Sequence, residues 1–326
     1  MESSILIRYG ALDAHFEQAR AQGLRLGRVE RQEKLLYTII TEGGAEFLAV
    51  TGRFRHLAEN PGQYPVAGDW VLFSARGIEA LLPRQSFLVR VAAGAVPYPQ
   101  PIAANMDILF VCMPADATYN PAMLERFLAA AVASGAKTVV VLTKADLCGT
   151  IEGRLAGVRA FAPNLDAVTC TSSRPDGFDP ARAYMRPGVT AALIGMSGAG
   201  KSTLINALSG ASIETQEVRK DGKGRHTTTR RELILLPAGG VLIDTPGMRE
   251  LALETSDVAS AFPELDALAK GCRFRDCAHG DEPGCAVREA VSRGEVDARR
   301  YHSYLKLLSE QNRRETRRRS EMKRKH

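Results

Sequence analysis

One nine-residue stretch constrains this chain more than any other, because it specifies both a local fold and a ligand. Residues 195–203 read G-M-S-G-A-G-K-S-T and fit the phosphate-binding pattern G-x-x-x-x-G-K-[ST]. An apolar run, residues 189–194, precedes the stretch, and a helix-like segment ending at Gly210 follows it. This order predicts a loop whose backbone N–H groups surround a phosphate at a helix N-terminus. A plain glycine turn between a strand and a helix is the alternative interpretation.

The residue types of this loop suggest individual roles. We expect Lys201 to reach the β- and γ-phosphates of a nucleotide, and the hydroxyl of Ser202 to bind Mg²⁺. The nucleotide-binding residues predicted in this loop are Gly195, Met196, Ser197, Gly198, Ala199, Gly200, Lys201, Ser202 and Thr203.

The loop lies in a region where strand-like and helix-like segments alternate. Asn120 followed by Pro121 is typical of a helix start, and a second helix is predicted over residues 151–161. Apolar runs predict strands at residues 107–113, 138–142, 167–170, 189–194, 233–236 and 241–243. Alternation of this kind indicates an α/β domain with a parallel sheet covered on both faces.

A candidate base-reading motif follows the run 138–142. Residues 143–146 are Thr143, Lys144, Ala145 and Asp146, and they resemble the guanine-reading [NT]-K-x-D motif of GTPases. One carboxylate can accept hydrogen bonds from N1–H and N2–H₂ of guanine, whereas adenine would leave Asp146 without a partner. Lys144 would lay its aliphatic stem along the base. After the next run, Thr171, Ser172 and Ser173 resemble the companion loop that contacts the base through backbone groups.

Two segments downstream of the phosphate loop have the features of switch regions. The polar loop 224–229 reads G-R-H-T-T-T, and the strand-like run 241–243 leads into D-T-P-G at 244–247. A threonine of the first segment, Thr228 or Thr229, would bind Mg²⁺ and sense the γ-phosphate. Asp244 would hold Mg²⁺ directly or through water, and the N–H of Gly247 would contact the γ-phosphate.

The order of these motifs indicates a circular permutation. In an ordinary GTPase the phosphate loop comes first and the base-reading motif comes late. Here residues 143–146 and 171–173 precede 195–203, and the switch-like segments 227–229 and 244–247 follow. The segment that senses the γ-phosphate therefore ends the GTPase domain, so we expect it to transmit the nucleotide state to the C-terminal part.

The C-terminal part contains a set of residues with metal-ligand spacing. Cys272, Cys277, His279 and Cys285 lie within fourteen positions, which suits one tetrahedral structural Zn²⁺ without an open coordination site. Small segments of low apolar content depend on such a metal to fold. The other cysteines, Cys112, Cys148 and Cys170, are isolated, and unrelated thiols with a surface histidine are the alternative for the cluster.

The N-terminal part reads as a small barrel. After a weakly patterned arm, residues 1–20, about five short strands without helices between them occur up to residue 91, which suggests an OB-fold. A structural barrel and an RNA-contacting barrel are both consistent with this pattern. The candidate stacking aromatics are Tyr37, Phe47, Phe54, Trp70 and Phe73, and the basic residues that favour RNA are Arg25, Arg28, Arg31, Arg53, Arg55 and His56.

Length and charge complete the outline. A chain of 326 residues predicts two or three domains, and we expect boundaries at 1–96 for the arm and OB-fold, 97–256 for the GTPase domain and 257–326 for the zinc-binding domain. A linker is expected at 97–101. Residues 313–326 hold eight Lys or Arg and two Glu, which equals the whole net charge of +6. This tail suits phosphate backbones, and a solvated end accounts for it equally well. No apolar run approaches the length of a bilayer span, so we expect a cytoplasmic monomer with no membrane partner.

Together these motifs resemble the RsgA (YjeQ/YloQ) family of small-ribosomal-subunit-dependent GTPases. The segments G-M-S-G-A-G-K-S-T, G-R-H-T-T-T, D-T-P-G-M-R-E-L and C-R-F-R-D-C-A-H-G-D-E-P-G-C-A-V occur in the permuted order of that family, across nearly the whole chain. The resemblance implies GTP hydrolysis to GDP, stimulated by the small ribosomal subunit in its late maturation, with the barrel and the zinc domain binding rRNA. Many relatives have Asn where this chain has Thr143, so we expect a weaker hydrogen bond between the base site and the phosphate loop.

The expected reaction is Mg²⁺-assisted in-line attack of water on the γ-phosphate. Residue 248 is Met and cannot orient water as a glutamine would, so slow intrinsic turnover is expected, with His226 as the candidate for positioning water. Two other classes of function are open at this stage. One is a GTP-switched RNA-binding module with incidental hydrolysis, and the other is an ATP-using phosphate-loop protein.

Overall fold

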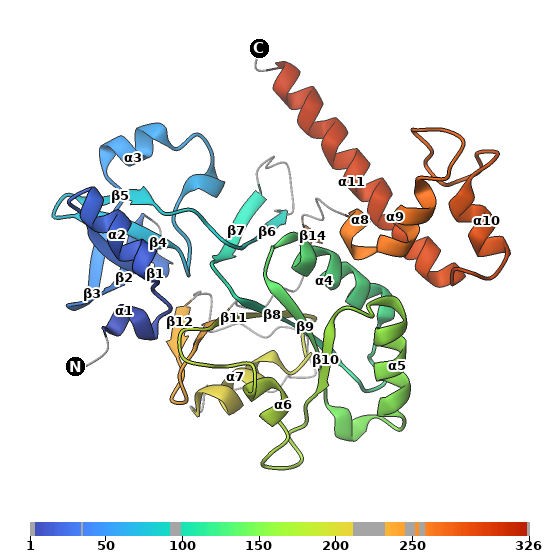
Figure 1. Ribbon diagram of the computed structural model, residues 1–326, viewed down its shortest axis with the longest axis horizontal. Helices are drawn as coiled ribbons and strands as arrows, with labels where there is room; N and C mark the ends of the chain where they lie inside the picture. The colour runs from blue at the N-terminus through green and yellow to red at the C-terminus, as the bar shows by residue number, and fades with distance from the viewer. Residues whose placement is uncertain are drawn as a thin grey trace, which may run out of the picture.

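The computed structural model describes residues 4–33, 35–91, 99–210, 232–244, 252–253 and 258–324. A small barrel at the N-terminus, a central mixed sheet with helices on both faces and a helical C-terminal part lie side by side, and the long last helix extends away from the body (Figure 1). Within these ranges, no helix combines the length and the apolar character that crossing a bilayer requires.

The first part of the chain is ordered into two helices. They are α1 (Ile5–Arg8) and α2 (Asp13–Ala21). The expectation of a loose arm is therefore wrong for these residues, because Leu6 is fully buried and anchors α1 in the main core. The weak sequence pattern reflects how few side chains of these short helices face inward.

Five antiparallel strands form the barrel, in the order β3-β2-β1-β4-β5. A parallel bridge between Val50 and Ile78 joins the ends of this order, and helix α3 (Gly52–Leu57) lies between the third and fourth strands. This is the OB-like arrangement that the sequence predicts, but the expectation of strands without helices between them is wrong at α3, where the buried Phe54 packs the short helix on the barrel core. The strands are β1 (Arg25–Glu33), β2 (Leu36–Thr41), β3 (Gly44–Ala49), β4 (Trp70–Ser74) and β5 (Gly77–Leu81), with a short 3₁₀ turn η1 (Pro61–Gln63).

The aromatic residues of the barrel mostly fill its interior. Tyr37, Phe54, Trp70 and Phe73 are buried, whereas the side chain of Phe47 is 66% exposed on β3. Four of the five candidates are therefore core residues and not stacking residues. Phe47 is the one whose ring could stack on a base.

A small third sheet links the parts of the molecule. It consists of β6 (Phe87–Val91), β7 (Pro99–Ala104) and β14 (Ala252–Leu253), in the order β14-β6-β7. The linker interpretation is wrong for residues 99–101, since Pro99 and Pro101 pair with β6 as part of a strand. Proline is compatible with this position because β7 is an edge strand.

The central sheet has six strands in the order β10-β9-β8-β11-β13-β12. Five run parallel, as expected, and β12 is antiparallel to β13. The turn between these two strands is too short for the crossover that a parallel pair requires. The strands are β8 (Ile108–Pro114), β9 (Lys137–Thr143), β10 (Asp166–Thr169), β11 (Thr190–Gly195), β12 (Glu232–Leu235) and β13 (Val241–Asp244).

Helices cover both faces of this sheet. Along β8, Leu109, Val111 and Met113 face one core, while Phe110 and Cys112 face another, as the period of two requires. Helices α4 (Pro121–Ala133) and α5 (Ile151–Phe161) pack on the first face, and α6 (Asp179–Arg182) and α7 (Lys201–Ser209) on the second. The predicted start of α4 is confirmed, because the Asn120 side chain accepts a hydrogen bond from the N–H of Met123 at 3.0 Å.

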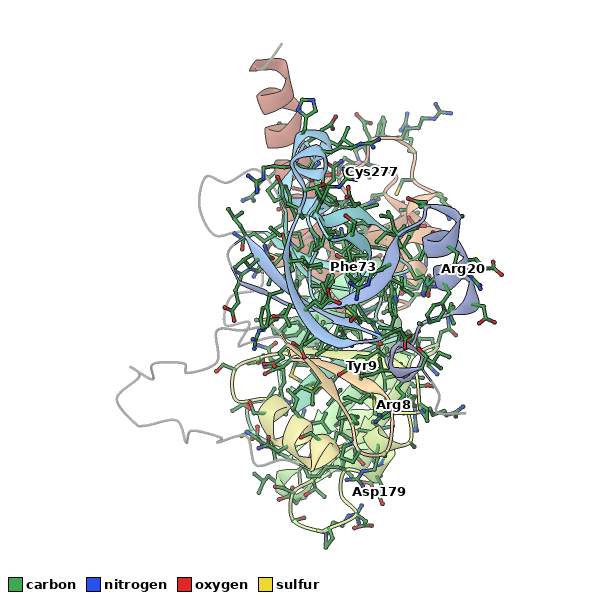
Figure 2. The ribbon with its side chains drawn as sticks, turned by 90° about the vertical axis from the view of Figure 1, so that its left-hand side faces the viewer. Arg8, Tyr9, Arg20, Phe73, Asp179 and Cys277 are labelled. Carbon is green, nitrogen blue, oxygen red and sulfur yellow. The ribbon has the colours of Figure 1, made fainter. Side chains whose placement is uncertain are left out.

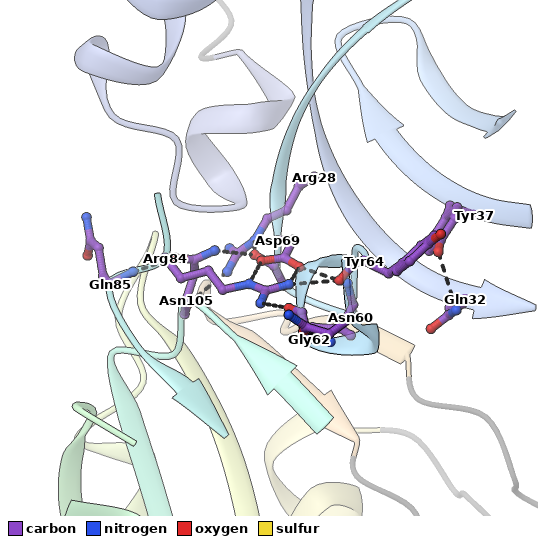
Figure 3. A network of polar contacts seen from close by, with 12 residues as sticks. Arg28, Gln32, Tyr37, Asn60, Gly62, Tyr64, Asp69, Arg84, Gln85 and Asn105 are labelled. Carbon is purple, nitrogen blue, oxygen red and sulfur yellow. Dashed lines mark hydrogen bonds and ion pairs between the residues drawn. The ribbon is translucent and has the colours of Figure 1, made fainter. Parts of the chain in front are cut away.

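A buried arginine joins the barrel to the central sheet. The guanidinium of Arg28, 1% exposed, donates to the Thr190 hydroxyl at 2.8 Å, to the Asn105 carbonyl at 3.1 Å and to the Tyr9 carbonyl. Figure 3 shows Arg28 next to Asn105 and to the ion pair of Asp69 and Arg84, and Figure 2 places Tyr9 at the boundary between the two parts. Arg28 is therefore unable to contact RNA, contrary to the expectation from its charge.

The C-terminal part packs on α4. Its helices enclose a separate core that includes Phe262, Leu265 and Tyr304 together with Ala129 of α4. The carboxylate of Glu125, also on α4 and 1% exposed, lies 3.1 Å from Arg299 and 3.5 Å from Arg300. The helices are α8 (Val258–Ala261), α9 (Pro263–Ala269), α10 (Ala286–Ser292) and α11 (Ala298–Arg324).

Candidate functional site

The phosphate loop connects β11 to α7, as its sequence predicts. Gly195 has φ +150°, and a Cβ at that position would lie 2.2 Å from the Cys112 carbonyl oxygen, so a side chain would collide with β8. Gly200 is the N-cap of α7 with φ +77°, a conformation that favours glycine. The loop therefore passes close to its neighbour strand and presents the first N–H groups of α7, which suit an anion.

Lys201 lies across this loop. Its Nζ donates to the carbonyls of Gly195 at 2.8 Å and Met196 at 2.7 Å. Burial lowers the pKa of Lys201, while Cys112 and Asp244 oppose that shift. The ammonium is thus held over the loop by two carbonyls, and a phosphate bound there would offer it a stronger, charged acceptor.

The base-reading motif begins where β9 ends. Lys144 has φ +54°, and the next residues form the 3₁₀ turn η2 (Ala145–Leu147). The N–H of Ala145 donates to the Cys170 carbonyl at 3.1 Å, and the Thr171 hydroxyl donates to the Asp146 carboxylate. The structure therefore brings residues 143–146 and 171–173 together at the carboxyl edge of the sheet, where open α/β sheets bind ligands.

The companion loop has its own internal hydrogen bonds. The Ser173 N–H donates to the Thr171 hydroxyl at 3.1 Å, and the Ser173 hydroxyl lies 2.8 Å from the same oxygen. Ser172 and Ser173 are exposed, whereas Thr171 is buried. The Thr171 hydroxyl thus holds in place both the backbone of its own loop and the Asp146 carboxylate.

Thr143 connects the base-reading motif to the phosphate loop. Its hydroxyl donates to the Ala199 carbonyl at 2.8 Å and lies 3.4 Å from the Met113 carbonyl. The sequence led us to expect a weakened hydrogen bond at this point, because Thr stands where many relatives have Asn. The structure has a hydrogen bond of ordinary length between the two loops.

Asp244 lies at the end of β13, next to the strand that carries the phosphate loop. Residues Ala192 and Ile243 pair in the parallel register of β11 and β13, so both carboxyl ends meet at one edge. Burial raises the pKa of Asp244, Glu232 across the strand pair adds to the shift, and Lys201 opposes it. The Asp244 carboxylate and the Ser202 hydroxyl are oxygen donors, the kind that Mg²⁺ prefers.

The remaining predicted catalytic residues lie outside the described residues. They are His226, Thr228, Thr229 and Gly247.

The C-terminal cysteines and the histidine form a compact cluster. The ligand atoms of Cys272, Cys277, His279 and Cys285 all lie within 4.8 Å of one another. His279 Nδ1 is 3.5 Å from the Cys272 sulfur and 3.6 Å from the Cys285 sulfur, and the two sulfurs are 4.0 Å apart. Tetrahedral Zn–S and Zn–N bonds imply separations of about 3.5–3.8 Å. The four residues therefore fit a closed structural Zn²⁺ site.

The surroundings of the cluster favour metal binding. Burial lowers the pKa of His279, which keeps the imidazole in the neutral form that binds metal. The Tyr301 hydroxyl donates to the His279 carbonyl at 2.6 Å, and the Arg288 N–H donates to the Cys285 sulfur at 3.5 Å. Cys285 is the N-cap residue of α10, and Tyr301 of α11 holds the backbone of His279. Both helices therefore tie the cluster to the local core.

Sequence reasoning missed two acidic residues, one beside the base-reading motif and one between α4 and α11. Asp116, in the loop between β8 and α4, forms an ion pair with Lys144, and Glu125 is buried against α11. The signal for Asp116 was weak: it is a polar residue just after a buried strand, which is a common place for ligand contacts. Glu125 interrupts the apolar pattern of α4, and a carboxylate at such a position requires a partner.

Known proteins resemble this chain along most of its length. The sequence profile of the RsgA GTPase family matches residues 81–254. A Lactiplantibacillus plantarum protein named small ribosomal subunit biogenesis GTPase RsgA 2 is 44% identical, over 94% of this chain and 89% of that protein. A Xylella fastidiosa protein named small ribosomal subunit biogenesis GTPase RsgA is 46% identical, over 77% of this chain and 76% of that protein.

Solved structures show the same architecture. YjeQ from Thermotoga maritima superposes with a TM-score of 0.63 at 25% identity and covers 88% of this chain and 98% of its own. YloQ, described as a circularly permuted GTPase, superposes with a TM-score of 0.61 at 21% identity and covers 89% and 96%. The second likeness supports the permuted fold, and the family profile and the relatives support the activity. The chain therefore belongs to the RsgA GTPase family.

Proposed function

We propose that this protein binds the small ribosomal subunit and acts in its late maturation, with Mg²⁺-dependent hydrolysis of GTP to GDP that the subunit stimulates. One observation carries the nucleotide part of this proposal. Thr143 Oγ1 donates to the Ala199 carbonyl at 2.8 Å, which joins the predicted base-reading loop to the predicted phosphate loop in a single site. The names of the relatives support the ribosomal part.

The residues of the site would divide the work as follows. The N–H groups at the start of α7 and the ammonium of Lys201 would hold the β- and γ-phosphates. Ser202 and Asp244, with Thr228 or Thr229, would hold Mg²⁺, which when bound neutralises charge that develops on the phosphate oxygens. The Gly247 N–H would contact the γ-phosphate. Asp146 would accept from guanine, and Thr171 would orient its carboxylate.

The subunit would complete the catalytic site. Met248 has no group that orients water, so hydrolysis by the isolated protein should be slow. We propose His226 as the residue that positions water once the subunit is bound. GTP hydrolysis would then occur mainly when the protein is bound to a small subunit.

Two exposed surfaces are suited to rRNA. On the barrel, Phe47 of β3 is exposed, and so are Arg53 and Arg55 of α3. On the zinc-binding part, Phe274 is 41% exposed between Arg273 and Arg275. Arginines interleaved with an exposed aromatic ring suit phosphates and unstacked bases. A cytoplasmic monomer of this kind would grip rRNA through both ends of the molecule.

One experiment separates this proposal from a GTP-switched RNA-binding module. GTP hydrolysis is measured with purified small subunits, with large subunits and with neither. We expect small subunits to raise turnover by about a hundredfold or more, since completion of a GTPase site typically contributes at least that much, and large subunits to have no effect. Equal turnover in all three mixtures would show that hydrolysis is incidental to binding. The same assay with ATP tests the remaining alternative.

A further inference from the structure

We infer that Asp116 is a positioning residue for the guanine site, because its carboxylate fixes the ammonium of Lys144 and so orders the side chain that covers the base. This inference rests on the proposed nucleotide site and extends it by one residue. The Lys144 Nζ lies 3.1 Å from Asp116 Oδ2. Asp116 is separated from Lys144 by 28 positions, and the two meet because they follow neighbouring parallel strands.

The carboxylate of Asp116 is itself held in place. Its Oδ1 accepts hydrogen bonds from the N–H of Thr118, at 2.8 Å, and from the Thr118 hydroxyl. The Tyr119 N–H donates to the Asp116 carbonyl at 3.0 Å, and the Arg154 guanidinium covers the Tyr119 ring at 4.3 Å from its centroid. One oxygen thus anchors the loop, and the other oxygen points at Lys144. Hydrogen bonds from Thr118 lower the pKa of Asp116, so the group is charged at neutral pH.

The backbone of Lys144 is also fixed on both sides. Thr143, before it, is bonded to the phosphate loop, and Asp146, two residues after it, is bonded to Thr171. The Ala115 N–H donates to the Thr143 carbonyl at 2.8 Å, which sets the register between the two loops. What is left to order is the side chain of Lys144, a long flexible stem. Asp116 does this by holding its far end.

The pair is poorly placed to serve stability alone. The Asp116 side chain is 16% exposed and that of Lys144 is 36% exposed. Because the Lys144 end of the pair is about a third exposed, water screens the attraction, and a solvent-screened pair contributes about 1 kcal/mol or less to folding. A lysine whose stem must lie along a base, in contrast, binds more tightly when it is already ordered, because the binding step then loses less side-chain freedom.

The same sheet offers a matched control. Lys137 starts strand β9, and Lys144 follows directly after its last residue. Lys137 pairs with Asp166 of the neighbouring strand at 2.8 Å, so an aspartate–lysine pair stands at each end of one strand. Asp116→Asn and Asp166→Asn remove the same charge from an aspartate–lysine pair, and only Asp116 lies near the proposed nucleotide site.

The test is fluorescence titration of the full-length protein with a fluorescent GDP and a fluorescent GTP analogue. Asp116→Asn should lower the affinity for both nucleotides alike, by about three- to tenfold, because both carry the same base. Asp166→Asn should bind as the unmodified protein does. In a Lys144→Met background the Asp116→Asn change should have no further effect, since the ammonium that it positions is gone.

The contrary outcomes are separable. Binding by Asp116→Asn that is equal to, or tighter than, that of Asp166→Asn would overturn the positioning role and leave the nucleotide site intact. If Asp116→Asn still lowers nucleotide affinity in the Lys144→Met background, the carboxylate acts through the fold of its loop. That result also overturns the inference. Failure of the unmodified protein to bind GDP would instead contradict the proposed function.

Discussion

The Thr143 hydroxyl donates a hydrogen bond of 2.8 Å to the Ala199 carbonyl, so the loop expected to read the base and the loop expected to hold the phosphates are joined. These residues are 56 positions apart in the sequence. Because the contact is between a side chain and the backbone of the phosphate loop, it would fix the separation between the proposed base and phosphate subsites before a nucleotide arrives. Such preorganisation reduces the cost of binding.

Thr143→Val should weaken GDP binding about fivefold, which corresponds to the loss of about 1 kcal/mol for one buried hydrogen bond. Valine has nearly the shape of threonine, so packing is kept. Thr143→Ser retains the hydroxyl and is the control. Calorimetric titration of both variants measures the effect, and equal affinities for the valine and serine variants would show that the hydrogen bond is dispensable.

Arg28→Met should lower the melting temperature by about 6–10 °C, the effect of roughly 3 kcal/mol lost when buried partners of a charged group are left unsatisfied. The carbonyls of Tyr9 and Asn105 would lose their donor. Arg25→Met on the same strand removes an exposed arginine and should lower the melting temperature far less. Thermal unfolding followed by circular dichroism compares the two, and similar shifts would contradict a specific role of Arg28 at the junction.

Cys277→Ser should abolish the one bound zinc ion expected per chain and destabilise the C-terminal part, because a structural zinc contributes directly to folding. Metal analysis and thermal unfolding, with and without a chelator, measure both effects. Cys148→Ser changes a free cysteine outside the cluster and should leave metal content and unfolding unchanged. A zinc content near one in the Cys277→Ser variant would exclude this residue as a ligand.

His226→Ala should reduce small-subunit-stimulated GTP hydrolysis by at least about tenfold, as expected for loss of a group that positions the attacking water, and should spare GTP binding. His302→Ala, on the exposed face of α11, is the matched histidine control. Single-turnover hydrolysis with saturating subunits separates chemistry from subunit binding. Unchanged stimulated turnover in His226→Ala would remove the role.

The features that sequence reasoning predicted are those fixed by local chemistry. The phosphate loop needs glycine at residue 195, where β8 passes within reach, and again at residue 200, where φ is positive. The three cysteines and the histidine that fit a zinc site likewise lie within fourteen positions. The N-cap at Asn120 depends on a contact three residues away. Each leaves a pattern that a short window of sequence can reveal.

The features that were missed depend on distant partners. Arg28 meets Thr190 across 162 positions, and its sequence neighbourhood gives no sign that it is buried. Asp116 meets Lys144 through strand order, and β7 is a strand because β6 pairs with it. Helices α1 and α2 are short and are stabilised by packing on the main core. In each case tertiary contacts outweigh the local preferences of the chain.

Selection of guanine by Asp146 is the claim on which the account depends most, and competitive nucleotide binding tests it most directly. The unmodified protein should bind GDP about a hundredfold or more tightly than ADP, because adenine leaves the carboxylate without a donor. The Asp146→Asn variant should lose affinity for GDP and gain affinity for xanthosine diphosphate, because the base of the latter offers an oxygen where guanine has an amino group. ADP that displaces GDP as well as GDP itself does, or an Asp146→Asn variant with unchanged preference, would contradict the account.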